Sequence, residues 1–305
     1  MYSLSSNYEP YISLTQNTMI TKAQIIARLH TARNYLAAFP QEGDDKEPEE
    51  VIIAEKISLE RYIRLRTSER NLPASIRLVD GRIIAYEVSR RPHGVVASEI
   101  LYLVRSWSGE LLTMSEPDII ITPNSMNVAD GGIVPNRLPR PPVAQQCDMD
   151  GAPYPTMVIE VGYSESFPSL HRLAADYFSA RTSIQLYLAI KIYSRRPAGT
   201  RAMLAALYRR TCPAPMVPIV KSFGTASLSD SVPVYLRGIG VLDASITGVG
   251  RHGAPACDAA GIPIYQLNLP AAELFNGAPA GIPAAAVAGF NLDLWDLQTA
   301  IQNAS

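Results

Sequence analysis

The sequence is poor in cysteine and has no long uninterrupted apolar run. Three cysteines, Cys147, Cys212 and Cys257, occur in 305 residues, and their wide spacing excludes a disulfide framework and a cysteine-based zinc cluster. The longest uncharged stretch, residues 274–292, contains two prolines and three glycines, which interrupt any membrane-spanning helix. We therefore expect a protein without a membrane span that works in a reducing compartment.

A strong charge of one sign is absent as well. The 27 Lys and Arg against 28 Asp and Glu give a formal net charge of −1, which excludes a protein that coats nucleic acid through overall positive charge. Hydrophobic residues make up 47% of the chain and charged residues 18%, as is typical of a folded protein with a sizeable core. The first 20 residues lack a basic segment followed by an apolar one, so we expect an intracellular protein, cytoplasmic or nuclear.

Hydrophobic periodicity and turn residues predict the elements before residue 110. Apolar residues at helical spacing predict helices over residues 21–39, from Ser58 onward and over residues 95–107. The Ser58 hydroxyl can accept a backbone hydrogen bond in the first turn of its helix, which makes it a capping residue. Asp80-Gly81 tolerates positive φ and so predicts the tight turn of a hairpin over residues 75–88.

The middle of the chain predicts a strand, a helix and a second strand in close succession. Residues 156–161 and 184–193 are short apolar runs, as expected for strands that are covered on both faces. Between them, residues 166–181 carry an apolar stripe at helical spacing. A βαβ unit of this length predicts two parallel strands joined by a right-handed crossover.

The composition predicts three segments. Residues 1–55 would hold the N-terminal helix and an acidic linker over residues 41–50, and residues 56–193 would form the core. Residues 194–305 would form a Pro/Ala-rich C-terminal extension. Strand-like pieces at residues 232–236 and 262–267, and a helix that begins near residue 291, are expected in that extension.

Glu160 is a charged residue near the end of an otherwise apolar strand. A buried charge without a partner is strongly destabilising, so Glu160 needs a compensating group. The C-terminal end of a parallel strand is also where open α/β sheets place their ligands. Two interpretations remain open: a carboxylate of a functional site, or one that points out of the sheet edge and bonds to a loop.

Lys191 lies near the end of the neighbouring predicted strand. Side chains alternate along a strand, so Lys191 shares a face with Tyr187 and Ala189. It could pair with Glu160 for structural reasons only. Alternatively, it could act on a water molecule at a metal ion that carboxylates hold.

A metal ion needs a further oxygen ligand, and Asp130 and Asp118 are the candidates. Each lies at the start of a predicted strand, a position that Asp also favours as an ordinary turn residue. His93 lies where a helix begins, in Pro92-His93-Gly94, and could contact substrate, although a capping or structural role is more common there.

The order of these features resembles the family named "Uma-type putative restriction endonucleases", within the PD-(D/E)XK nuclease superfamily, and its fungal-type branch in particular. The resemblance covers residues 56–193 and includes the hairpin with its Asp-Gly turn, Pro92-His93-Gly94, and an Asp before a short strand. It also includes Ala-Ile-Lys-Ile at 189–192 and the string Tyr-Pro-Thr-Met-Val-Ile-Glu-Val-Gly-Tyr-Ser-Glu-Ser at 154–166. The piece at 292–301 is similar to that branch too.

The resemblance implies an α/β fold with a mixed sheet and a restriction-endonuclease-like αβββαβ core. By position, Asp130 and Glu160 match the family's magnesium ligands, and Lys191 stands in for its lysine. Ala129 replaces the proline of the family motif and Gly162 replaces its lysine. Weaker candidates for the site are Asp118, which does follow a proline, Glu99 on the first helix of the core, and His93.

Two functions are therefore expected. The first is an endonuclease that uses Mg²⁺ or Mn²⁺ to hydrolyse DNA phosphodiester bonds, with DNA as its partner. A homodimer is the assembly that we consider for it. The alternative is a catalytically inactive descendant that serves as a binding or interaction module. Residues 137–221 hold eleven Lys and Arg against five Asp and Glu, which suits a polyanionic substrate but equally an ordinary solvated surface.

Overall fold

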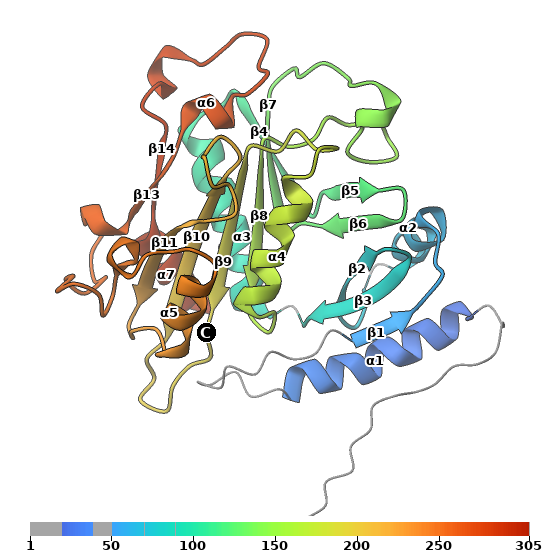
Figure 1. Ribbon diagram of the computed structural model, residues 1–305, viewed down its shortest axis with the longest axis horizontal. Coiled ribbons are helices and arrows are strands. Elements are labelled where there is room, and N and C mark those ends of the chain that lie inside the picture. Colours follow the sequence, from blue (N-terminus) through green and yellow to red (C-terminus); the bar gives the residue numbers. More distant parts are fainter. Residues whose placement is uncertain (1–19, 39–50, 70, 89, 305) are drawn as a thin grey trace, which may run out of the picture.

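A computed structural model describes residues 20–38, 51–69, 71–88 and 90–304 of the chain. Two sheets organise these residues, one of five strands and one of seven (Figure 1). The acidic segment at residues 41–50, predicted to be a linker, lies outside the described residues.

The five-stranded sheet is antiparallel and has the order β1-β3-β2-β6-β5. Its strands are β1 (Val51–Ala54), β2 (Ser75–Val79), β3 (Arg82–Glu87), β5 (Asp118–Thr122) and β6 (Ser125–Val128). Two helices, α1 (Lys22–Ala38) and α2 (Leu59–Ser68), bury their apolar stripes against this sheet. The two helices and the sheet enclose a small core of their own.

Local signals in this part of the sequence are confirmed. The Ser58 hydroxyl accepts a hydrogen bond of 3.3 Å from the backbone N–H of Arg61 and so caps α2. Asp80 and Gly81 have φ values of 48° and 75° and form the tight turn between β2 and β3. Positive φ at both central residues matches the twist of the two strands, which explains the preference for Asp-Gly.

The seven-stranded sheet is mixed and has the order β12-β11-β10-β9-β8-β7-β4. Its strands are β4 (Leu111–Ser115), β7 (Gly131–Pro135), β8 (Met157–Gly162), β9 (Leu186–Ile192), β10 (Ala202–Arg209), β11 (Ile219–Gly224) and β12 (Thr247–Gly248). Strands β8 and β9 pair in parallel, as the βαβ pattern predicted, with Glu160 opposite Ala189. Strands β5 and β6 are inserted between β4 and β7 in the sequence and belong to the other sheet.

Helices cover both faces of the large sheet. In Figure 1, α4 (Phe167–Tyr177) lies in front of the sheet and α3 (Arg91–Trp107) lies behind it. The C-terminal helix α7 (Leu294–Ala304) packs against α3, and α5 (Ser231–Gly238) packs on the face that α4 covers. From α3 to β9 the order is αβββαβ once the inserted hairpin is set aside, so the predicted α/β fold with this core is confirmed.

Alternation along β9 divides the core between the two faces of the sheet. Leu188 and Ile190 pack on the α3 face, whereas Tyr187 and Ala189 pack on the α4 face, and all four are fully buried. Both faces are therefore apolar, which accounts for the nearly continuous hydrophobic run in the sequence.

Some predictions after residue 200 were wrong. The segment predicted as a strand at residues 232–236 belongs to helix α5, because Pro233 and Leu236 bury one helical face and outweigh the strand preference of its valines. The piece at residues 262–267 begins with a 3₁₀ turn, and only Gln266–Leu269 forms a strand, β13. Residues Phe290–Asp293 form strand β14, which pairs with β13 before α7 begins.

The C-terminal segment is tied closely to the large sheet, since β10 to β12 extend that sheet and α7 covers α3. The boundaries proposed at residues 55/56 and 193/194 stay predictions. The remaining elements of the described residues are the short helix α6 (Ala271–Leu274) and four 3₁₀ turns. These turns are Val143–Gln145, Asp243–Ser245, Pro263–Tyr265 and Ala284–Ala286. No helix in the described ranges combines the length and hydrophobicity that a membrane span requires.

Candidate functional site

Glu160 lies near the C-terminal end of β8, on the face that α4 covers. Alternation places it on the same side as Val158, with 2% of its surface exposed. The hydroxyl of Tyr177, at the end of α4, donates a hydrogen bond to Glu160 Oε1. Tyr177 is the one hydrogen-bond donor to this carboxylate among the described residues. The carboxylate is thus buried with only part of its bonding capacity used.

Asp130 comes directly before β7 and lies beside Glu160. Strand β7 is antiparallel to β8, and Gly131 pairs with Ile159, so the residue before β7 reaches the level of Glu160. The backbone N–H of Val161 donates to Asp130 Oδ2 at 2.6 Å. Asp130 Oδ1 bonds to Nε2 of His93 at 2.8 Å. The structure therefore brings Asp130, Glu160 and His93 together.

The electrostatics of this group follow from burial and proximity. Burial raises the pKa of Glu160 well above its ordinary value, and the neighbouring Asp130 charge raises it further, against the opposing effect of Arg77. Burial alone would lower the pKa of His93, but the carboxylates of Asp130, Glu87 and Glu165 outweigh it and raise that pKa to about 9. His93 is therefore an imidazolium at neutral pH and balances Asp130.

Lys191 lies on the same face of the sheet as Glu160, one strand away. In the parallel register it is opposite Gly162, the position at which the family motif has its lysine. Its Nζ donates to the backbone carbonyls of Tyr163 and Glu165, each at 2.7 Å. The structure does not contain the Lys191–Glu160 ion pair that the sequence left open, within the described residues. Lys191 bonds to carbonyl acceptors in the loop after β8 instead.

Gly162 has no room for a side chain. A Cβ atom there would lie 2.8 Å from the Glu165 carbonyl oxygen and 2.9 Å from Cδ1 of Leu170, both closer than such atoms normally approach. A lysine at position 162 would therefore displace the loop after β8 or helix α4. Since Lys191 faces Gly162 across the strand pair, its ammonium reaches the same loop without that clash.

Glu87 was missed by sequence reasoning. It ends β3 of the five-stranded sheet and is fully buried. Its carboxylate accepts hydrogen bonds from the backbone N–H groups of Tyr163, Ser164 and Glu165 and from the Ser164 hydroxyl, at 2.6–3.1 Å. Glu87 thereby holds the loop whose carbonyls bind Lys191.

Arg77 and Glu165 form a second buried link between the sheets. Arg77 of β2 donates to Glu165 Oε1 at 2.8 Å, and its guanidinium lies 3.6 Å from the ring centre of Tyr86. The Ser169 hydroxyl donates to the same oxygen at 2.6 Å. A sequence signal existed, since Arg77 interrupts an apolar strand and Glu165 lies in the string that carries the resemblance.

The two weaker acidic candidates lie apart from this group. The Asp118 carboxylate forms an ion pair with Arg66 of α2, so its charge is matched outside the Asp130–Glu160 pair. Glu99 lies on α3 six residues after His93, which is about 240° around a helix of 3.6 residues per turn. No contact among the described residues joins Glu99 to Asp130 or Glu160.

The carboxylate oxygens of Asp130 and Glu160 are the type of ligand that a hard divalent cation prefers. Among the described residues, no group of three or more His, Cys, Asp or Glu side chains is arranged to hold a metal ion. Mg²⁺, however, commonly takes only one or two protein carboxylates and completes its shell with water and phosphate oxygens. Burial raises the pKa of Glu160 most and the Asp130 charge raises it further, so a cation at the two carboxylates would favour the charged form of Glu160.

Similarity to known proteins is found among solved structures. No family profile and no curated protein matches the chain. Among solved structures, a similar chain is described as a "putative nuclease belonging to DUF820 from Anabaena variabilis ATCC 29413". The two are 12% identical with a TM-score of 0.42, over 80% of this chain and 99% of the other. The strand order and pairing of the core define a restriction-endonuclease-like α/β fold.

The crowding at Gly162 leads to a stability prediction. Gly162→Ala should lower the free energy of unfolding by about 1–3 kcal/mol, and Gly162→Lys by at least as much, because each overpacks the contact with Glu165 and Leu170. Urea denaturation measures this. Gly94→Ala is the control, because a Cβ at Gly94 meets nothing within 4 Å, and its stability should be unchanged or slightly higher. Equal stability of both alanine variants would contradict the packing described.

The burial of Lys191 leads to a prediction on pH. Burial lowers the pKa of Lys191 to about 8, although Glu87 and Glu165 oppose that shift. Between pH 8 and the ordinary pKa of lysine, the unfolded chain therefore binds more protons than the folded one. The contribution of Lys191 to stability rises with pH across that window. NMR of ¹³C-labelled lysine should show one side chain that titrates near pH 8 and is missing in Lys191→Met. A titration above pH 10 would contradict the buried placement.

Proposed function

We propose that this protein is a metal-dependent endonuclease that hydrolyses DNA phosphodiester bonds. One observation carries the proposal: the carboxylates of Asp130 and Glu160 lie side by side at the paired ends of β7 and β8, with Lys191 on the same face of the sheet. A buried carboxylate such as Glu160, whose pKa is raised by burial and by the neighbouring Asp130 charge, is costly without a function or a cation.

Asp130 and Glu160 would hold the metal ion. Mg²⁺ or Mn²⁺ bound there would supply a Lewis acid that activates water and offsets the charge of the phosphate. His93 fixes one oxygen of Asp130 and the N–H of Val161 fixes the other, while Tyr177 orients Glu160. These hydrogen bonds leave lone pairs on the carboxylate oxygens and hold the oxygens in place.

Lys191 would supply positive charge close to the reacting phosphate. The two carbonyls that accept from its Nζ hold the ammonium in the loop after β8, on the side of the sheet that carries Glu160 and under the influence of the Glu87 and Glu165 carboxylates. Glu87 acts one step further away, since it fixes the loop that carries those carbonyls. We assign it a positioning role.

A second candidate function is an inactive descendant that binds a partner. The observation that favours it is that Lys191 already has hydrogen-bond acceptors within the protein. Its Nζ donates to two backbone carbonyls, and the residue is almost fully buried. Ala129 and Gly162, which replace the proline and lysine of the family motif, point the same way. In this candidate the charged group serves stability only.

We propose further that the protein belongs to the fungal-type branch of the Uma-type family and that DNA is its partner. The proposed assembly is a homodimer, and the proposed location is intracellular, in the cytoplasm or nucleus. The excess of Lys and Arg over residues 137–221 supports a polyanionic partner.

Cleavage of DNA tests the proposal directly. The protein with Mg²⁺ or Mn²⁺ should cleave supercoiled plasmid DNA, and Glu160→Gln should reduce the rate at least about a hundredfold, because the amide keeps the shape but removes the charge that holds the cation. Glu110→Gln makes the same chemical change at an exposed position at the start of β4, away from the site, and should cleave like the wild type.

The outcome separates the two candidates. If Glu160→Gln loses cleavage while its melting temperature stays that of the wild type, the result supports the nuclease. Cleavage that persists in Glu160→Gln places the chemistry elsewhere in the chain. A wild-type protein that neither cleaves DNA nor binds Mn²⁺ in calorimetry favours the binding module.

A further inference from the structure

A second site lies where the C-terminal segment meets the large sheet. A pocket of about 330 Å³ opens there, a volume in the range of small-molecule sites. It is lined by the polar side chains of Arg195, Arg201, Thr225, Gln298 and Gln302, together with Gly199, Met203 and Ile301. None of the residues that we assign to the candidate nuclease site belongs to this lining.

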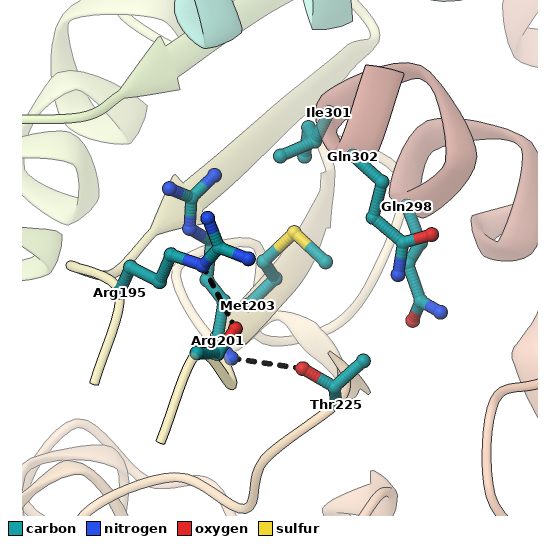
Figure 2. Close-up of a pocket in the computed structure, with 8 residues that line it drawn as sticks. Arg195, Arg201, Met203, Thr225, Gln298, Ile301 and Gln302 are labelled. Carbon is teal, nitrogen blue, oxygen red and sulfur yellow. Dashed lines mark hydrogen bonds between the residues drawn. The ribbon is translucent and has the colours of Figure 1, made fainter. Parts of the chain in front are cut away.

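Two arginines give the pocket its charge. Figure 2 shows the Arg195 and Arg201 side chains close together on one side of the pocket. Burial lowers the pKa of Arg201, and the charge of Arg195 lowers it further against the effect of Tyr163. No acidic side chain lines the pocket within the described ranges. Arg195 Nε donates to the Gly199 carbonyl at 2.9 Å, and two guanidinium groups that face one pocket suit the recognition of a bound anion.

The opposite wall is made of amides and apolar groups. Gln298, Ile301 and Gln302 project from α7, and Met203 lies between them and the arginines (Figure 2). Gln298 is 2% exposed, and its Nε2 donates to the Cys257 carbonyl at 2.7 Å, which leaves Oε1 as an acceptor without a partner in the described chain. A ligand that fits both walls carries an anionic group at one end and hydrogen-bond donors at the other.

The pocket is also close to the C-terminal edge of β8 and β9. Met203 pairs with Ile192, the residue after Lys191. Arg201 and Arg90 both lie near the ring of Tyr163, with their guanidinium carbons 6.0 Å and 5.3 Å from its centre. Positive groups thus run from the start of α3 to the pocket.

We propose that this pocket binds the phosphate group of a nucleotide, with Arg195 and Arg201 as its anion ligands and the amides of α7 facing the sugar or base. The nucleotide is either free or part of a nucleic acid strand, and both sources present the same chemistry. The inference goes beyond the proposed nuclease function, since binding here requires neither Asp130 nor Glu160.

Calorimetric titration of the full chain without divalent metal tests this proposal. Thymidine 5′-monophosphate should bind, and thymidine, which lacks the phosphate, should not. Arg195→Met and Arg201→Met should each weaken that binding about tenfold or more, because each removes a charge-assisted hydrogen bond. Arg196→Met is the matched control from the same loop: its guanidinium bonds to the Ser227 carbonyl outside the pocket, and affinity should stay within about twofold.

The titration has clear outcomes. Equal binding of thymidine and its monophosphate, no binding of the monophosphate, or unchanged affinity in both Arg195→Met and Arg201→Met overturns the proposal. If Arg201→Met fails to fold, Arg195→Met alone makes the comparison, and unchanged affinity in that variant then overturns the proposal. A four-nucleotide thymidine strand that binds more tightly than the monophosphate assigns the pocket to nucleic acid, and the reverse order assigns it to a free nucleotide.

Discussion

Buried negative charge at the C-terminal end of β8 is the constraint on which the surrounding structure depends. Four carboxylates gather there, from Glu87, Asp130, Glu160 and Glu165. Burial of so many acidic groups is unfavourable unless donors and cations compensate them. The compensation comes from Arg77, His93 and Lys191, from backbone N–H groups, and from the Ser169 and Tyr177 hydroxyls. Glu160 has the fewest hydrogen-bond donors of the four among the described residues, since only the Tyr177 hydroxyl donates to it.

This compensation joins the two sheets into one unit around the site. Arg77 and Glu87 belong to the five-stranded sheet, yet they bond to the loop that follows β8 of the seven-stranded sheet. That loop in turn holds Lys191 through two carbonyls. The small sheet therefore does more than extend the core. It fixes Lys191, which lies opposite Gly162, where a side chain has no space.

Sequence reasoning predicted what local patterns determine. Periodicity located β8, α4 and β9, and the βαβ pattern predicted that the strands of Glu160 and Lys191 are parallel neighbours. Sequence reasoning did not find the roles of Arg77 and Glu87. Arg77 is visible as a charge in an apolar strand, but the partners of both residues lie 76 to 88 residues away, and no local pattern encodes that distance. The bonding partners of Lys191 escaped for the same reason. In α5, the valines favoured a strand in isolation, and burial of Pro233 and Leu236 decided otherwise.

We propose that Asp130 and Glu160 form a cation site. Anomalous diffraction from a crystal soaked in Mn²⁺ tests this most directly, because the signal locates the ion and its ligands at once. One manganese peak should lie within direct coordination distance of an oxygen from each of the two carboxylates. A crystal that shows no peak there at saturating Mn²⁺, with His93 still bonded to Asp130, would contradict it.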